Sequence, residues 1–392
     1  MRRITDVERR ARLVRRHHVA PSTRATDVVG LAERLVGLHA TDPATVFLAA
    51  AARLKRPTVE AVERALYNDR TLVRTLCMRR TLFVVPVDLV PLVQAAVTDA
   101  LVPGERKRTV RMIEESGIAR NGARWLREVE AETLAAIEER GEVTGAELSK
   151  AVPRLRKQIP YGEGKTWAGK MGMTTRVLFL LSCEQRVVRG RPQGSWTSTR
   201  YRWAPRSAWI PDGFPSLKPD EARSELVRRW LSAFGPGTVA DIKWWTGWPL
   251  GRTRQAIAAL DTVDVELDNG TVGIVLAGDD APVRALEPAA ALLPSLDPTT
   301  MGWTQRDWYL GPHRPALFDR AGNAGPTVWW DGRIVGGWTQ RKGGEIVWRL
   351  FEDVGADGVR AVEREAARVH AWLGGTAVLP RFPTPLYDQL RG

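Results

Sequence analysis

Residues 71–85 read TLVRTLCMRRTLFVV, and this stretch indicates how the first third of the chain folds. β-Branched and apolar residues fill 71–78 and 81–85, as in two neighbouring strands, and Arg79-Arg80 joins them as the turn of a hairpin. Three helical patterns come directly before it, at residues 27–38, 43–54 and 58–68. Three helices followed by a hairpin are the order of a winged helix, so the sequence predicts such a unit here.

The same order occurs twice more along the chain. The second passage has a capping box at Thr144 and Glu147, which starts a helix. The further elements of the second passage are a longer helix over 167–183 and paired strands around 190–194. The third passage has helices at 221–234, 238–245 and 251–260, followed by strands at 263–267 and 271–275. One instance alone could be a structural helical hairpin, but three in one chain favour tandem winged-helix units.

The last third of the chain has a different character. Residues 327–350 alternate apolar strands with tight glycine turns, which predicts a three-stranded antiparallel meander, and a helix over 358–373 follows. We interpret this part as a small β-barrel or a curled sheet. The predicted fold class is therefore α+β: three tandem winged-helix units followed by a small antiparallel β-barrel-like domain. The expected domains are residues 1–120 with flanking helices, 121–210, 216–283 and 284–392.

The charge of the chain predicts a polyanionic partner. Lysine and arginine number 58 against 45 acidic residues among 392, for a net charge of +13. Such an excess builds a positive field, and duplex DNA is the partner that we expect. Basic residues recur near the predicted hairpins, although any one of them could be a solvated surface side chain. The candidates for phosphate contacts are Arg74, Arg79, Arg80, Lys165, Lys170, Arg176, Arg189, Arg191, Arg200 and Arg202.

Other classes of protein are disfavoured. No stretch reaches the ~20 apolar residues of a membrane span, and the N-terminus lacks the apolar run of a signal peptide, so we expect a soluble, cytoplasmic, nucleoid-associated protein. Cys77 and Cys183 are far apart and show no C-x-x-C spacing, which predicts reduced structural thiols. The histidines lack partners at metal-ligand spacing, so no metal and no cofactor are expected.

Residues 38–43, LHATDP, place three polar side chains in a row between two apolar helical patterns. His39 and Thr41 lie where the first helix ends, and Asp42 precedes Pro43 as the natural N-cap of the next helix. Each also has a plain structural interpretation. A histidine can bind free carbonyls at a helix end, a threonine can bond to the local backbone, and the aspartate can be a cap and nothing more.

Four segments together resemble the winged-helix DNA glycosylase family that includes the bacterial azinomycin-resistance and interstrand-crosslink glycosylases. Residues 38–43 are similar to that family's catalytic Gln-apolar-Gln-Asp-Pro segment, and 78–83 to its Met-Arg-Gly-Thr-Leu-His wing. Residues 293–298 and 331–338 resemble the two signatures of its C-terminal barrel.

The chain departs from the family pattern at four positions. His39 and Thr41 replace both glutamines, and Arg80 and Phe83 replace the glycine and histidine of the wing.

The resemblance implies a monofunctional DNA glycosylase of DNA repair, acting on alkylation damage or in self-resistance without metal or cofactor. Its substrate would be N7-alkylated guanine in duplex DNA, including bulky or crosslinked adducts. His39 and Thr41 would position or activate water, and Asp42 would assist electrostatically. Asp297, in the first barrel signature, is a candidate to face the site. A monomer is expected, because three units already lie in one chain.

The chemistry agrees with neutral side chains at such a site. An N7-alkylated guanine already carries positive charge, so it leaves without protonation, and the enzyme needs only to stabilise the oxocarbenium-like sugar and orient a water molecule. A histidine of ordinary pKa near 6.5 could accept a proton from that water. Two other classes stay open: a non-catalytic winged-helix DNA-binding protein or transcriptional regulator, and a protein-interaction scaffold.

Overall fold

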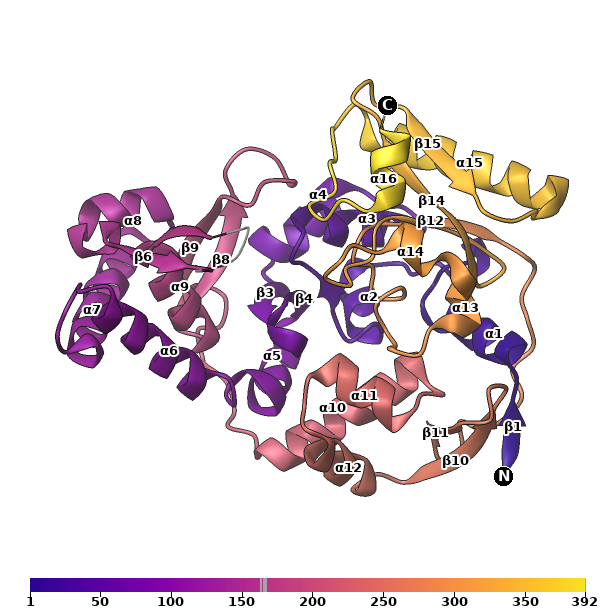
Figure 1. Cartoon of the computed structure of the whole chain (residues 1–392), viewed down its shortest axis with the longest axis horizontal. Coiled ribbons are helices and arrows are strands. Elements are labelled where there is room, and N and C mark those ends of the chain that lie inside the picture. Colours follow the sequence, from indigo (N-terminus) through magenta and orange to yellow (C-terminus); the bar gives the residue numbers. More distant parts are fainter. Residues whose placement is uncertain (163, 165–167, 392) are drawn as a thin grey trace.

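The structure is a computed structural model, and it describes residues 1–162, 164 and 168–391. Helices followed by a small sheet occur three times, and a larger antiparallel sheet follows them (Figure 1). In Figure 1 the second of these groups lies at the left of the molecule, and the hairpin of the first group lies between it and the rest of the chain.

The first group contains the predicted hairpin and a third strand that the sequence did not reveal. Its elements are α2 (Val28–Arg34), α3 (Pro43–Arg53), α4 (Val59–Glu63), β2 (Leu38–His39), β3 (Leu72–Leu76) and β4 (Leu82–Pro86). The sheet order is β2-β4-β3. The helix predicted over 27–38 ends at Arg34, because Val36 and Gly37 adopt positive φ angles of 54° and 105°. This turn lets Leu38 and His39 form a strand instead.

The second group follows α6 (Val102–Glu115) and has a hydrophobic core of its own. Its elements are α7 (Gly122–Arg140), α8 (Gly145–Ala151), α9 (Met173–Cys183), β5 (Val143–Thr144), β8 (Val187–Pro192) and β9 (Tyr201–Pro205). The predicted capping box is confirmed, because Thr144 Oγ1 and the Glu147 carboxylate each accept from the other's backbone N–H. The helix predicted over 167–183 begins only at Met173. Its expected start at 167 lies outside the described residues, and a hairpin of β6 (Gln158–Tyr161) and β7 (Gly169–Gly172) precedes it.

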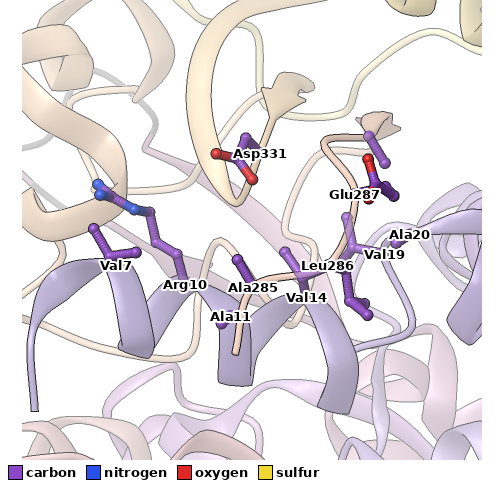
Figure 2. Close-up of a pocket in the computed structure, with 11 residues that line it drawn as sticks. Val7, Arg10, Ala11, Val14, Val19, Ala20, Ala285, Leu286, Glu287 and Asp331 are labelled. Atoms are coloured by element: carbon purple, nitrogen blue, oxygen red, sulfur yellow. The ribbon is translucent and has the colours of Figure 1, made fainter. Parts of the chain in front are cut away.

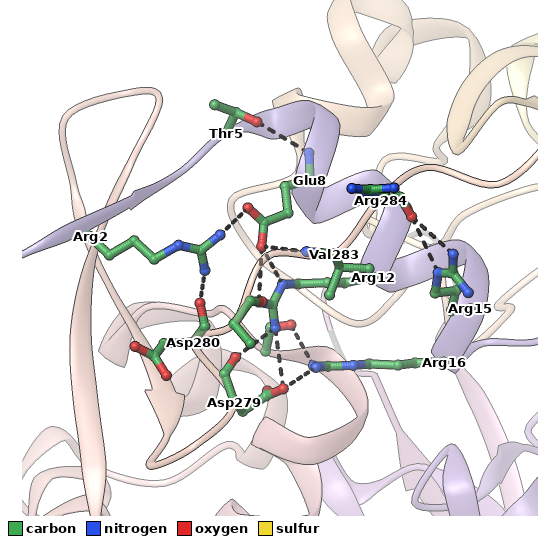
Figure 3. A network of polar contacts seen from close by, with 12 residues as sticks. Arg2, Thr5, Glu8, Arg12, Arg15, Arg16, Asp279, Asp280, Val283 and Arg284 are labelled. Carbon is green, nitrogen blue, oxygen red and sulfur yellow. Dashed lines mark hydrogen bonds and ion pairs between the residues drawn. The ribbon is translucent and has the colours of Figure 1, made fainter.

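The third group departs from the other two in the origin of its third strand. Its elements are α10 (Pro219–Phe234), α11 (Val239–Thr246), α12 (Leu250–Ala258), β10 (Thr262–Leu267) and β11 (Val272–Leu276). β1 (Arg2–Ile4), from the other end of the sequence, pairs in parallel with β10. The helix that follows it, α1 (Asp6–Arg16), carries Arg12 and Arg16, and both guanidinium groups bind Asp279 just after β11 (Figure 3).

The C-terminal part is an open sheet in the described residues, so of the two predicted forms, a small β-barrel or a curled sheet, the closed barrel is not confirmed. In the described residues the sheet has the antiparallel order β12-β13-β14-β15, with β12 and β15 at separate edges. Its elements are β12 (Ala290–Leu293), β13 (Thr327–Trp330), β14 (Arg333–Gln340), β15 (Ile346–Leu350) and the helices α13 (Asp307–Leu310), α14 (Arg314–Leu317), α15 (Gly355–Leu373) and α16 (Pro385–Leu390). Instead of a closing strand, α15 packs against β12 and β15.

Helix α3 belongs to the largest hydrophobic core of the described residues, to which the first group, the third group, the C-terminal sheet and a few residues of the second group contribute. All eleven residues of α3 are buried. Cys77 and Cys183 are buried and unpaired, as predicted for structural thiols. No single described helix is long and apolar enough to cross a bilayer, and only a bent pair, residues 87–98 with 102–115, reaches that length and composition together.

Candidate active site

The segment from His39 to Asp42 is fixed against strand β4 of the first hairpin. His39 pairs with Phe83 in the sheet. The Ala40 N–H donates to Leu82 O over 2.7 Å, and the Leu82 N–H donates to Thr41 Oγ1 over 3.3 Å. His39, Thr41 and Asp42 therefore lie within four positions of one another, on a junction between β2 and the start of α3 that hydrogen bonds hold against β4.

His39 is a buried, neutral side chain. Only 3% of its surface is exposed, and its ring centroid lies 5.0 Å from that of Phe83. The Thr41 N–H makes a long hydrogen bond of 3.5 Å to Nδ1. Burial, together with the positive charge of Arg79, lowers the pKa of His39 to about 3. The imidazole is therefore uncharged near neutral pH and is a weak base.

Asp42 caps α3, as predicted, and also binds the C-terminal segment. Its Oδ1 accepts from the Ala44 N–H at 3.0 Å. Its Oδ2 accepts from the backbone N–H of Arg381 at 3.2 Å. Burial raises the pKa of Asp42, whereas the backbone hydrogen bonds and the charge of Arg381 oppose that rise. The carboxylate thus joins two segments that lie far apart in the sequence.

Thr41 lines a groove of about 550 Å³ between the first and second groups. Arginine, threonine and aromatic side chains are prominent among the groove's described lining residues, and no Asp or Glu is among them. These lining residues are Thr41, Leu82, Thr144, Gly145, Ala146, Thr174, Thr175, Leu178, Phe179, Arg189, Gln193, Thr199, Arg200, Tyr201, Trp203 and Arg381. Cationic, hydroxyl and aromatic groups of this kind suit phosphates, sugars and bases.

Two of the predicted DNA-binding arginines reach this groove. Arg189 stacks on the ring of Trp203, with 4.6 Å from its guanidinium carbon to the ring centroid. Arg200 is exposed at the groove wall. Arg202, on the same strand as Trp203, is partly exposed, and Lys170 is exposed on β7. Lys165 lies outside the described residues.

The turn of the first hairpin is built from two arginines in the left-handed region. Arg79 and Arg80 have φ angles of 53° and 59°, and the Thr81 N–H donates to Met78 O across the turn. This conformation favours glycine, so the turn is strained. The Arg79 guanidinium stacks on Trp244 of α11, 3.9 Å from the ring centroid.

Three outer arginines of the predicted set have partners on the protein but stay accessible. Arg80 pairs with Glu105, and Arg191 pairs with Glu63 and lies over the ring of Tyr67. Arg79, Arg80 and Arg191 remain partly or fully exposed, and their contact with DNA stays a prediction.

Three predicted site residues are buried in ways that correct the prediction. Arg74 is 2% exposed, and its guanidinium stacks on the ring of Tyr201. Arg176 is 7% exposed and pairs with Glu105 at 2.6 Å. Asp297 is fully buried in an ion pair with Arg53 and does not face the groove. Arg74 and Arg176 are therefore occupied within the fold and not open to a phosphate group, and Asp297, predicted as possibly facing the site, is held by Arg53 instead.

Sequence reasoning missed Arg381. It lines the groove and donates its backbone N–H to Asp42, but it lies in an irregular segment with no local pattern that could assign it to residues 38–43. A separate hollow of about 60 Å³ beside α1, with Arg10, Glu287 and Asp331 on its walls, shares no lining residue with the groove (Figure 2). Within the described ranges, no three His, Cys, Asp or Glu side chains gather as a metal site.

Comparisons with known proteins agree with this architecture. The chain is 31% identical over 185 residues to the interstrand DNA cross-link repair glycosylase of Streptomyces sahachiroi, an alignment that covers 45% of this chain and 49% of the relative. The chain therefore aligns with only about half the length of that relative. The solved structure of the DNA glycosylase AlkZ from Streptomyces sahachiroi has the same fold, with a TM-score of 0.71 and 23% identity over 97% of this chain and 99% of that one.

The family assignment rests on a match over most of the chain. The sequence model of the AlkZ-like DNA glycosylases, described as "DNA glycosylase AlkZ-like", matches residues 32–372. That range contains the junction at residues 38–43, the C-terminal sheet and the described lining residues of the groove except Arg381. The chain therefore belongs to the AlkZ-like DNA glycosylase family.

Proposed function

We propose that this protein is a monofunctional DNA glycosylase that hydrolyses the N-glycosidic bond of N7-alkylated guanine in duplex DNA, including interstrand crosslinks. Family membership supports the glycosylase class, and the name of the Streptomyces relative supports the crosslinked substrate. The protein would act as a monomer on chromosomal DNA, in the cytoplasm and at the nucleoid.

The observation that carries the proposal is the position of Thr41. Its side chain is at once part of the fixed junction with Asp42 and part of the wall of an acid-free groove with three arginines. DNA drawn into this groove by its phosphates would bring a deoxyribose to the junction. Thr41 would then orient the attacking water, and the negative charge of Asp42 would stabilise the oxocarbenium-like sugar.

His39 has an orienting role in this proposal. A group whose pKa is about 3 is a poor proton acceptor, so water activation by this imidazole contributes little at neutral pH. Its neutral ring instead fixes the backbone of Thr41 through Nδ1 and packs against Phe83. A cationic leaving base makes a strong general base unnecessary, because the water needs positioning more than deprotonation.

The experiment measures base release from duplex oligonucleotides that contain N7-methylguanine or an N7–N7 crosslink. The decisive variant is Asp42→Asn, because asparagine caps a helix as well as aspartate does. It removes the charge and one of the two acceptors, so the cap at Ala44 can be kept while the bond from the Arg381 N–H is lost. We expect base release to fall by about 10²–10³-fold, as for the loss of one electrostatic contact to a transition state. DNA affinity should stay unchanged. Thr133→Val, which removes a buried hydroxyl bonded to Val129 O in the second group, is the matched control.

One observation favours a second candidate function. The low exposure of His39 agrees with a protein that binds DNA without cutting the glycosidic bond, such as a winged-helix regulator. A wild-type protein that binds DNA tightly but releases no base from any N7-alkylated or crosslinked duplex would refute the glycosylase proposal. A sequence-selective footprint on undamaged DNA would then support the regulator.

A further inference from the structure

Asp42 borders a second, much smaller cavity of about 20 Å³. The start of α3 forms one wall through Ala44 and Thr45, the segment after β12 forms another through Ser295, and the end of β14 forms a third through Thr339. A single water molecule needs about 10–15 Å³ of such space and two to four polar partners. The cavity is therefore large enough for one water molecule.

Two of the residues that line this cavity carry hydroxyl groups without partners. Ser295 Oγ and Thr339 Oγ1 are buried, and neither makes a hydrogen bond to any described residue. The residues are 4% and 2% exposed. A buried hydroxyl that lacks a hydrogen bond is costly, and such groups are commonly satisfied by an ordered water molecule. Two of them on one cavity next to a carboxylate supply polar partners for a water molecule, in a cavity whose remaining lining is mostly apolar.

The walls of the cavity are fixed relative to Asp42. Thr45 Oγ1, in the first turn of α3, donates to Ser295 O at 2.7 Å. Trp338 Nε1, next to Thr339 on β14, donates to Leu293 O at 2.9 Å. These bonds tie α3, β12 and β14 together around the cavity, so a bound water molecule would have a defined position.

We propose that Ser295 and Thr339 are positioning residues that hold one water molecule against the carboxylate of Asp42. The water would donate one hydrogen to an Asp42 oxygen and use its remaining hydrogen and lone pairs for the two hydroxyl groups. This inference rests on the proposed function in one respect, because Asp42 must act as a carboxylate for the water to influence catalysis.

The water would keep Asp42 ionised. The positive charge and the backbone N–H of Arg381 both act on the Asp42 carboxylate. The phenol of Tyr201 interacts with the negative charge of Asp42, and His39 is neutral. Burial raises the pKa of Asp42, and every donor to the carboxylate works in the opposite direction. Removing the water should therefore raise the pKa of Asp42 and shift its ionisation toward higher pH.

The test compares the pH dependence of base release in the wild type, Ser295→Ala and Thr339→Val. We expect the acidic limb of the profile to move to higher pH by about one unit in each variant, the order expected for one lost hydrogen bond to a charged group. Thr339→Ser keeps the hydroxyl and should restore the wild-type profile, while Thr133→Val should leave it unchanged. An acidic limb at the same pH in both Ser295→Ala and Thr339→Val would overturn the proposal.

A second measurement does not depend on activity. A high-resolution crystal structure of the wild-type chain should show one water molecule within hydrogen-bonding distance of Ser295 Oγ, Thr339 Oγ1 and a carboxylate oxygen of Asp42. An empty cavity would refute this inference. If the water is present but wild-type protein releases no base, the proposed function fails and the water site stands.

Discussion

Arg53 and Asp297 form an ion pair at the end of α3 whose loss should destabilise the protein strongly. Both side chains are fully buried, and the two shortest contacts are 2.6 and 2.9 Å. Three further acceptors complete the set: His17 O, Ala49 O and Thr299 Oγ1. All five N–H groups of the guanidinium are thus used. Replacing Asp297 by Asn keeps the size of the side chain but leaves a buried positive charge without its counter-ion.

The expected cost follows from that burial. Removing one partner of a buried pair typically lowers the free energy of unfolding by about 3–5 kcal/mol, because the remaining charge stays desolvated. Asp297→Asn should show this loss in urea unfolding followed by tryptophan fluorescence. The double variant Arg53→Met with Asp297→Leu removes both charges but leaves His17 O and the Thr299 N–H without their partners, so it should recover only part of the lost stability.

An exposed ion pair provides the matched control. Arg333 and Glu352 lie 3.1 Å apart with 40% and 33% of their side chains exposed, so Glu352→Gln should cost less than about 1 kcal/mol. A cost for Asp297→Asn no greater than that for Glu352→Gln would refute the reasoning, since burial would then have no influence on the pair.

The other predictions concern DNA binding and the histidine. Arg200→Ala should weaken binding to DNA of any sequence and reduce the steepness of log affinity against log salt concentration by about one, as measured by fluorescence anisotropy. Arg320→Ala, which removes an exposed arginine outside the groove, should change neither. The pKa of His39 is about 3 in the folded protein, below the ordinary value near 6.5. The free energy of unfolding is therefore not reduced by this group above pH 6.5, and it decreases as the pH falls from 6.5 toward 3, because the unfolded chain then binds a proton that the folded chain does not. In His39→Gln the free energy of unfolding should fall less steeply between pH 6.5 and 3, measured by unfolding at a series of pH values. A decrease as steep as in the wild type would contradict the burial of His39.

Local patterns in the sequence predicted the elements well where the chemistry is local. The capping box of Thr144 and Glu147, the cap at Asp42 and the hairpin at residues 71–85 depend on neighbours within a few positions, and the structure contains them. The helix over 27–38 was predicted too long, because helical periodicity continues through Val36 and Gly37 although their backbone turns away.

Contacts between distant segments could not be predicted. Nothing near Arg74 or Arg176 in the sequence shows that Tyr201 and Glu105 will cover them, so both looked like DNA-binding arginines. The same is true of Asp297, whose partner Arg53 lies on α3. The barrel was predicted from strand content and from the resemblance of residues 293–298 and 331–338 to barrel signatures. Neither determines whether a sheet closes or is covered by a helix such as α15.

The hydrogen bond from the Arg381 N–H to Asp42 joins residues 339 positions apart. During synthesis, the ribosome must therefore produce the chain as far as Arg381 before this carboxylate gains its second backbone donor. A chain that stopped before Arg381 would carry the arginines of the first two groups that we predict to contact DNA, without a finished junction at residues 38–43. The junction at residues 38–43 is therefore completed only when a segment far along the chain folds onto it.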